Sequence, residues 1–114
     1  MQDSIDKYAS TVEAKIAQIV VDHLLGAGFL VSVEDGEEVT VRRSRDAAEI
    51  RAALCTTGED RLLVSTPEAP YGQAGGVLLI WGNGEDLISD YSVSLDVLMH
   101  TVMEAVDAII AAAA

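Results

Sequence analysis

The stretch VLLIWGNGEDLISDY, from Val77 to Tyr91, has the residue order of a β-hairpin. Val77 to Trp81 is a run of β-branched, apolar and aromatic residues, which favour extended backbone. Gly82-Asn83-Gly84 has the residue types of a tight turn, and Asp86 to Tyr91 supplies the returning strand. We expect this hairpin to form the centre of a β-sheet.

A second hairpin is predicted earlier in the chain. Phe29 to Val33 and Val39 to Arg43 read as strands, and the acidic segment between them contains Asp35-Gly36, which favours the positive φ angles of a hairpin turn. Arg61 to Ser65 is predicted as a further strand. Both prolines and three of the nine glycines lie between Thr66 and Gly76, so this segment is predicted as a loop or a wide hairpin connection.

The first predicted helix runs from Ile5 to Ala27. Its apolar residues recur at intervals of three and four, which is the spacing of one helix face. Asp3 is a suitable N-cap, and Gly26 or Gly28 can adopt the left-handed conformation that ends a helix.

Two more helices are predicted. Asp46 and Glu49 have the spacing of a capping box, which starts a short helix that reaches about Cys55. The last helix has a broad apolar face from Leu95 to Ile110, with Ser92 or Ser94 as its N-cap.

The element order α-β-β-α-β-β-β-α fits one fold class best. A chain of 114 residues is the size of one domain with one core, so residues 1–114 are expected to form a single domain. Strands joined by hairpins give a mainly antiparallel sheet of about five strands, and the helices must gather on one face to cover its apolar side. The prediction is a two-layer α+β sandwich.

Composition excludes several classes of protein. Cys55 is the single cysteine, so the chain has neither an internal disulfide nor a multi-cysteine zinc site. No apolar run approaches the roughly 20 residues of a membrane span, and the first residues do not resemble a signal peptide. A cytoplasmic protein without membrane contact is therefore expected.

The motifs of catalysis and cofactor binding are also missing. Tyr71 to Gly76 is glycine-rich but lacks the Gly-Lys-Ser/Thr ending of a phosphate-binding loop. Asp86, Asp90 and His100 would have to converge to form a metal site, and no His-x-x-x-His or Glu-x-x-His pair supports one. No nucleophile motif surrounds Cys55. We expect a protein that is not an enzyme and has no cofactor or metal.

Charge gives the one positive signal. The formal net charge is -12, and the segment from Leu62 to Ala114 has seven acidic residues and no Lys or Arg. Such a charge disfavours direct nucleic-acid binding and favours a basic host protein or nucleoprotein complex as partner. The residues predicted to bind it are Glu85, Asp86, Asp90, Asp96, Glu104 and Asp107, together with Tyr71 in the Gly/Pro-rich loop.

Part of the sequence also resembles a known group of proteins. Trp81 to Ser92, WGNGEDLISDYS, is similar to a YGN-x-x-D-V-I-S-D-Y segment of small uncharacterised proteins of bacterial phages, plasmids and other mobile elements. Val33 to Glu38 and Ser44 to Asp46 fit the same pattern, whereas Trp81 and Leu87 replace the usual Tyr and Val. The resemblance implies a short accessory protein that acts on host machinery, and it brings no catalytic residue.

Two functions follow from these observations. The first is a non-enzymatic inhibitor of a host nucleic-acid-handling complex, similar to an anti-CRISPR protein, whose carboxylates occupy a basic groove. The alternative is a structural or self-associating domain that buries Met99, Met103, Ile109, Ile110 and the alanine tail against a second copy, with charge serving only solubility.

Overall fold

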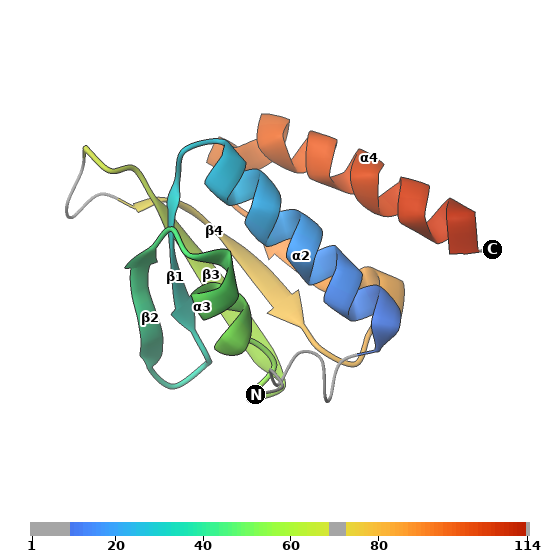
Figure 1. The fold of residues 1–114 in the computed structure, drawn as a ribbon, viewed down its shortest axis with the longest axis horizontal. Helices are drawn as coiled ribbons and strands as arrows, with labels where there is room; N and C mark the ends of the chain where they lie inside the picture. The colour runs from blue at the N-terminus through green and yellow to red at the C-terminus, as the bar shows by residue number, and fades with distance from the viewer. Residues whose placement is uncertain (1–9, 69–72, 114) are drawn as a thin grey trace.

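The sheet has five antiparallel strands within residues 10–68 and 73–113, which are the residues that the computed structural model describes. In chain order the strands are β1 (Leu30–Glu34), β2 (Val39–Ser44), β3 (Glu59–Ser65), β4 (Gln73–Ile80) and β5 (Ile88–Tyr91). They lie side by side in the order β2-β1-β3-β4-β5 (Figure 1). The expectation that the Val77 to Tyr91 hairpin forms the centre is wrong, because β3 is the central strand and β5 lies at an edge.

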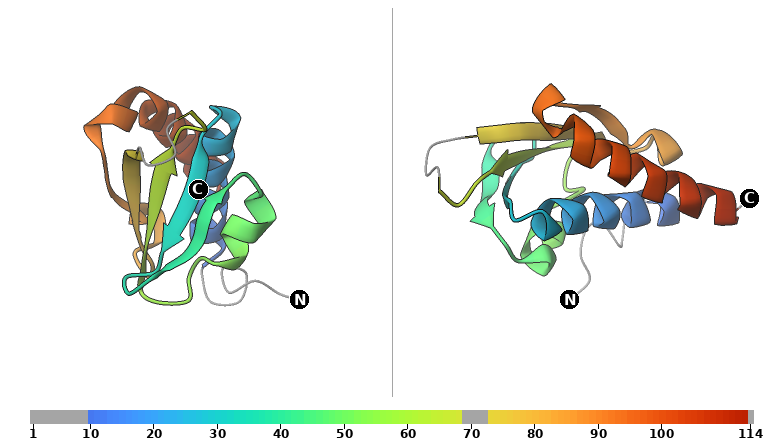
Figure 2. Two further views of the ribbon diagram at one scale, coloured as in Figure 1. Left: turned by 90° about the vertical axis from the view of Figure 1, so that its left-hand side faces the viewer. Right: turned by 90° about the horizontal axis from the view of Figure 1, so that it is seen from above.

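The helices cover one face of this sheet. They are α2 (Thr11–Gly26), α3 (Ala47–Ala52) and α4 (Asp96–Ala113), with 3₁₀ turns η1 (Gly84–Asp86) and η2 (Val93–Leu95) on either side of β5. Both α3 and α4 contact α2, and α4 runs beside α2 in the opposite direction (Figures 1 and 2). The predicted two-layer α+β sandwich is confirmed.

The core lies between the layers. Alternate residues of the strands face the helices, as expected for a sheet with one covered face. The buried apolar side chains on the helix-facing side of the sheet are Val31, Val33, Leu62, Val64, Val77 and Leu79, and those on the helices include Ile16, Val20, Leu24, Ile50, Met99, Val102 and Val106.

Helix α2 begins later than predicted. Ser10 has extended backbone and forms a capping box with Glu13, in which each side chain accepts a hydrogen bond from the other residue's amide. Asp3, the predicted N-cap, lies outside the described residues. At the other end, Gly26 and Gly28 were the predicted stop residues. Gly28 is the one that adopts the left-handed conformation, with a φ angle of 91°.

The predicted loop is shorter than expected because β4 begins at Gln73. Gly75 belongs to the strand, where glycine is needed for packing rather than for a turn. A Cβ atom at this position would lie 2.9 Å from Leu95 Cγ and 2.9 Å from Ser94 Oγ. The missing side chain therefore allows η2 to pack directly on the strand.

Three predicted cap contacts also differ. Asp46 caps α3 with its side chain, but its own amide donates to Ser44 Oγ at 3.0 Å and not to Glu49. Ser92 Oγ accepts a hydrogen bond from the Gly76 amide, and Ser94 Oγ donates to the carbonyl of Ala74. These serines are used to attach η2 to β4, so they do not cap α4.

Candidate binding surfaces

The outer side of α4 carries a row of polar side chains. Asp96, His100, Glu104 and Asp107 are all exposed. Their spacing of four, four and three residues places them along one side of the helix. We call this row the α4 stripe. It faces solvent because the opposite side of α4 packs on α2, and the chain has no Lys or Arg after Arg61 to offset its charge.

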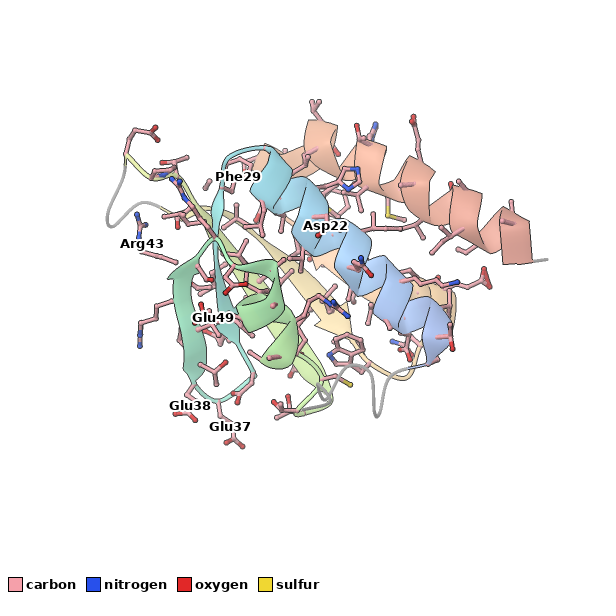
Figure 3. The ribbon with its side chains drawn as sticks, viewed as in Figure 1. Asp22, Phe29, Glu37, Glu38, Arg43 and Glu49 are labelled. Atoms are coloured by element: carbon pink, nitrogen blue, oxygen red, sulfur yellow. The ribbon has the colours of Figure 1, made fainter. Side chains whose placement is uncertain are left out.

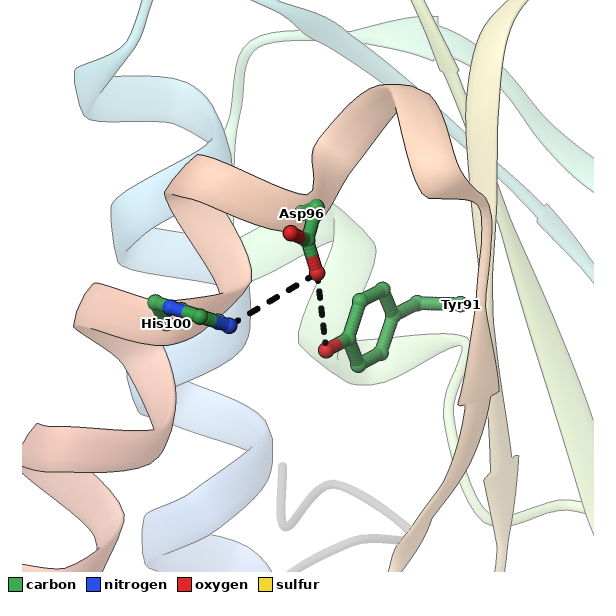
Figure 4. Close-up of polar contacts among 3 residues, drawn as sticks. All are labelled: Tyr91, Asp96 and His100. Atoms are coloured by element: carbon green, nitrogen blue, oxygen red, sulfur yellow. Dashed lines mark hydrogen bonds and ion pairs between the residues drawn. The ribbon is translucent and has the colours of Figure 1, made fainter.

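Contacts with the end of β5 hold the first carboxylate of the α4 stripe. Tyr91 Oη donates a hydrogen bond to Asp96 Oδ1 at 3.4 Å, and His100 Nε2 lies 3.7 Å from the same oxygen (Figure 4). The side chains of Asp96 and His100 are 54% and 72% exposed, so both remain available to a partner.

The structure does not gather the other predicted residues around the α4 stripe. Glu85 and Asp86 are exposed on η1, at the opposite end of β5. Asp90 pairs with Leu78, whose neighbours Val77 and Leu79 point into the core, so Asp90 lies on the face of the sheet away from the helices. The six predicted carboxylates thus fall into three groups, and Tyr71 lies outside the described residues.

The open face of the sheet brings together residues that are distant in sequence. Strand register aligns Glu34 with Arg61, Arg61 with Leu78, and Leu78 with Asp90, which forms one row across four strands. Glu59 lies on the same face, two residues before Arg61 on β3. Sequence analysis missed this row, because it depends on strand order and not on local spacing.

A groove follows this row. It consists of three adjoining hollows of about 460, 200 and 100 Å³, which share Glu59 at one junction and Arg61 and Leu78 at the other. It begins between Glu37 of the hairpin turn and Thr57 to Glu59, and it ends at Asp90 on β5. We call it the sheet groove. Toward the other end of β3, outside the groove, the Arg43 guanidinium donates a hydrogen bond to Ser65 Oγ at 3.1 Å.

A buried carboxylate, Asp60, lies on the other face of β3. Its Oδ2 accepts hydrogen bonds from the Cys55 amide at 2.8 Å and from Trp81 Nε1 at 2.7 Å. Its Oδ1 is buried and has no hydrogen-bond partner within residues 10–68 and 73–113. Burial raises the pKa of Asp60 above its ordinary value of 3.8, and the two hydrogen bonds oppose this shift only in part.

The pKa values of Cys55 and Glu13 are also shifted, in opposite directions. Burial, together with the negative charges of Asp60 and Glu13, raises the pKa of the Cys55 thiol, which therefore stays protonated and unreactive. Burial also opposes ionisation of Glu13, but amide hydrogen bonds from Ser10 and Gly82 outweigh it and hold its pKa below the ordinary value. The Glu13 to Gly82 bond, at 2.6 Å, ties the start of α2 to the turn after β4.

The described residues contain no group of three or more His, Cys, Asp or Glu side chains placed to hold a metal ion. Among the same residues, no helix has the length and apolar character needed to span a membrane. Comparisons with family models, curated proteins and solved structures found no match to this chain. The resemblance to mobile-element proteins stays a prediction.

Proposed function

We propose that this protein is a non-enzymatic, acidic binding protein of a mobile element that inhibits a host nucleic-acid-handling complex by occupying its basic groove. The α4 stripe carries the proposal, because it is an exposed row of carboxylates within a segment, Leu62 to Ala114, that has no Lys or Arg. A CRISPR effector complex, whose guide and target strands lie in a positively charged channel, is a host target of this kind.

The geometry of α4 suits competition with a nucleic acid. Glu104 and Asp107, about one helical turn apart, are separated by about 5–6 Å at their Cβ atoms, which is comparable with the spacing of phosphates along a strand. Asp96 lies about two turns before Glu104 on the same side of the helix. A rigid helix presents them without the ordering cost of a flexible acidic tail. Glu85 and Asp86 would extend the negative field beyond the helix. Binding of this kind weakens as salt rises, because exposed charges are screened over about 8–10 Å.

The test is inhibition of DNA binding by purified CRISPR effector complexes, measured by gel mobility shift with and without this protein. At least one complex is expected to lose target binding. The triple variant Asp96→Lys, Glu104→Lys and Asp107→Lys should inhibit that complex at least about tenfold less well, because each reversed contact costs up to about 1 kcal/mol.

A control variant separates the α4 stripe from net charge alone. Asp22→Lys, Glu38→Lys and Glu49→Lys reverse the same number of exposed carboxylates on α2, the first hairpin turn and α3 (Figure 3). This control should inhibit within about twofold of the natural protein. Equal inhibition by both triple variants, or no effect of the natural protein on any effector, would contradict the proposal.

Self-association is the second candidate, and exposed apolar residues favour it. Val93 on η2 is 89% exposed, and Val97 at the start of α4 is 85% exposed. Ile109 and Ile110 are half-buried near its end, whereas Met99, which was expected to lie in the interface, belongs to the core. A mass that rises with concentration in sedimentation, unchanged by the α4 triple variant, would support this function instead.

A further inference from the structure

We propose that the sheet groove binds an extended, Lys- or Arg-containing segment of the protein partner. This inference deepens the proposed function and rests on it for the nature of the partner, which is a basic protein. The sheet groove lies on the face of the sheet away from the core, so it is a second contact surface, separate from the α4 stripe. Figure 2 shows that the helices cover only the other face of the sheet.

Charge complementarity selects the occupant. Carboxylates of Glu34, Glu37 and Glu59 surround the larger part of the groove, and Asp90 closes its far end. Arg61 is the one cation in the lining, and no hydrogen bond or ion pair joins it to these carboxylates within the described part of the chain. An acidic segment would be repelled, and a wholly apolar one would desolvate the carboxylates without pairing them.

The floor of the groove matches the stems of basic side chains. Leu78 and Ile80 are half-exposed on β4 between the acidic rims. Lys and Arg carry three or four methylene groups before the charge, so they can cover an apolar floor while their cationic ends reach the rim. The carboxylates of Glu37 and Glu59 line the same hollow as Ile80, so a cation placed over Ile80 would lie in the same part of the groove as both.

The dimensions favour a short extended segment. The row from Glu34 to Asp90 crosses three strand spacings, or about 14 Å at roughly 4.8 Å each. A fully extended chain covers this distance with four or five residues, at about 3.3 Å per residue. A helix, at about 10 Å across, would stand above the floor and leave Leu78 in contact with water.

Fluorescence anisotropy with a labelled hexa-arginine peptide tests the inference on the full chain at about 150 mM salt. The groove variant Glu34→Gln, Glu59→Gln and Asp90→Asn should weaken binding at least about tenfold. Two matched variants remove as much charge from exposed positions outside the groove. One is Asp22→Asn, Glu49→Gln and Glu68→Gln, and the other is Asp96→Asn, Glu104→Gln and Asp107→Asn. Each should change the affinity less than about threefold. Arg61→Gln should strengthen binding, because it removes the opposing cation.

Amide chemical shifts measured during the titration locate the peptide without any variant. The expected result is a set of shifts confined to the row from Glu34 to Asp90 and the neighbouring hairpin turn. Equal loss of affinity in all three charge-removed variants, or shifts on α4 in place of the sheet, would overturn the inference. Peptide binding in the groove with no inhibited effector would overturn the proposed function alone, whereas an inhibited effector with no shifts in the groove would overturn this inference alone.

Discussion

At the scale of single residues, Asp60 is the most unusual feature of the molecule. It is fully buried, it accepts two hydrogen bonds through Oδ2, and its Oδ1 has no hydrogen-bond partner in the described part of the chain. An ionised carboxylate in such surroundings is costly, so the folded state retains the proton to a higher pH than the unfolded state. The stability of the protein is therefore linked to the titration of this one side chain.

The sign of this linkage is fixed by the raised pKa of Asp60. Below the ordinary value of 3.8 both states are protonated and there is no penalty. As the pH rises from that value through the folded-state pKa, the free energy of unfolding of the natural protein falls relative to that of Asp60→Asn. Denaturant titrations between about pH 3 and 7 measure this difference.

The exposed substitution Asp22→Asn is the control, and its stability should follow that of the natural protein over the same pH range. Parallel curves for the natural protein and Asp60→Asn would show that burial does not shift the Asp60 titration.

At the scale of elements, the contact between η2 and β4 depends on a missing side chain. Gly75 allows Leu95 and Ser94 to approach the strand, and the Gly76 amide and Ala74 carbonyl bond to serines of the same turn. These contacts fix where α4 leaves the sheet. A methyl group at Gly75 would have to displace Leu95 Cγ, which lies close to the backbone of η2.

Gly75→Ala is therefore expected to destabilise the protein by about 1–3 kcal/mol, the usual cost of overpacking a filled site. Gly58→Ala is the matched control, because no atom lies within 4 Å of its Cβ position. It should be nearly neutral. Thermal unfolding of the two variants compares them directly, and an equal melting temperature would contradict the packing argument.

The same contacts show how far elements can be predicted from sequence. Local signals, such as Asp35-Gly36 in the first hairpin and the apolar spacing of the helices, predicted the strands, the helices and their layering. The start of β4 and the roles of Ser92 and Ser94 were not predicted, because they depend on hydrogen bonds between residues 16 and 20 positions apart.

Of the two candidate binding surfaces, one could be predicted from the sequence and the other could not. The α4 stripe could be predicted because it depends only on helical period. The sheet groove could not, since Glu34, Glu59 and Asp90 meet only through the strand order β2-β1-β3-β4-β5. Alternation in Glu59-Asp60-Arg61-Leu62 does indicate which residues share a face, but it does not tell which strands are neighbours.

At the scale of the whole molecule, a net charge of -12 on 114 residues opposes folding through self-repulsion. We expect the melting temperature to rise by several degrees between about 20 mM and 500 mM sodium chloride, because salt screens this repulsion. The variant Asp22→Lys, Glu38→Lys and Glu49→Lys changes the net charge from -12 to -6, because each of the three reversals adds two. Its melting temperature should therefore depend less on salt. A melting temperature that falls with salt would instead indicate stabilising ion pairs.

The tie between Glu13 and Gly82 has a consequence for how the chain is made. The two residues are 69 positions apart, and α2 packs against α4, the last helix of the sequence. During synthesis on the ribosome, Ile16, Val20 and Leu24 therefore emerge long before the elements that cover them. Contacts over such separations form slowly. The nascent chain must keep this apolar face from aggregating until translation of α4 is complete.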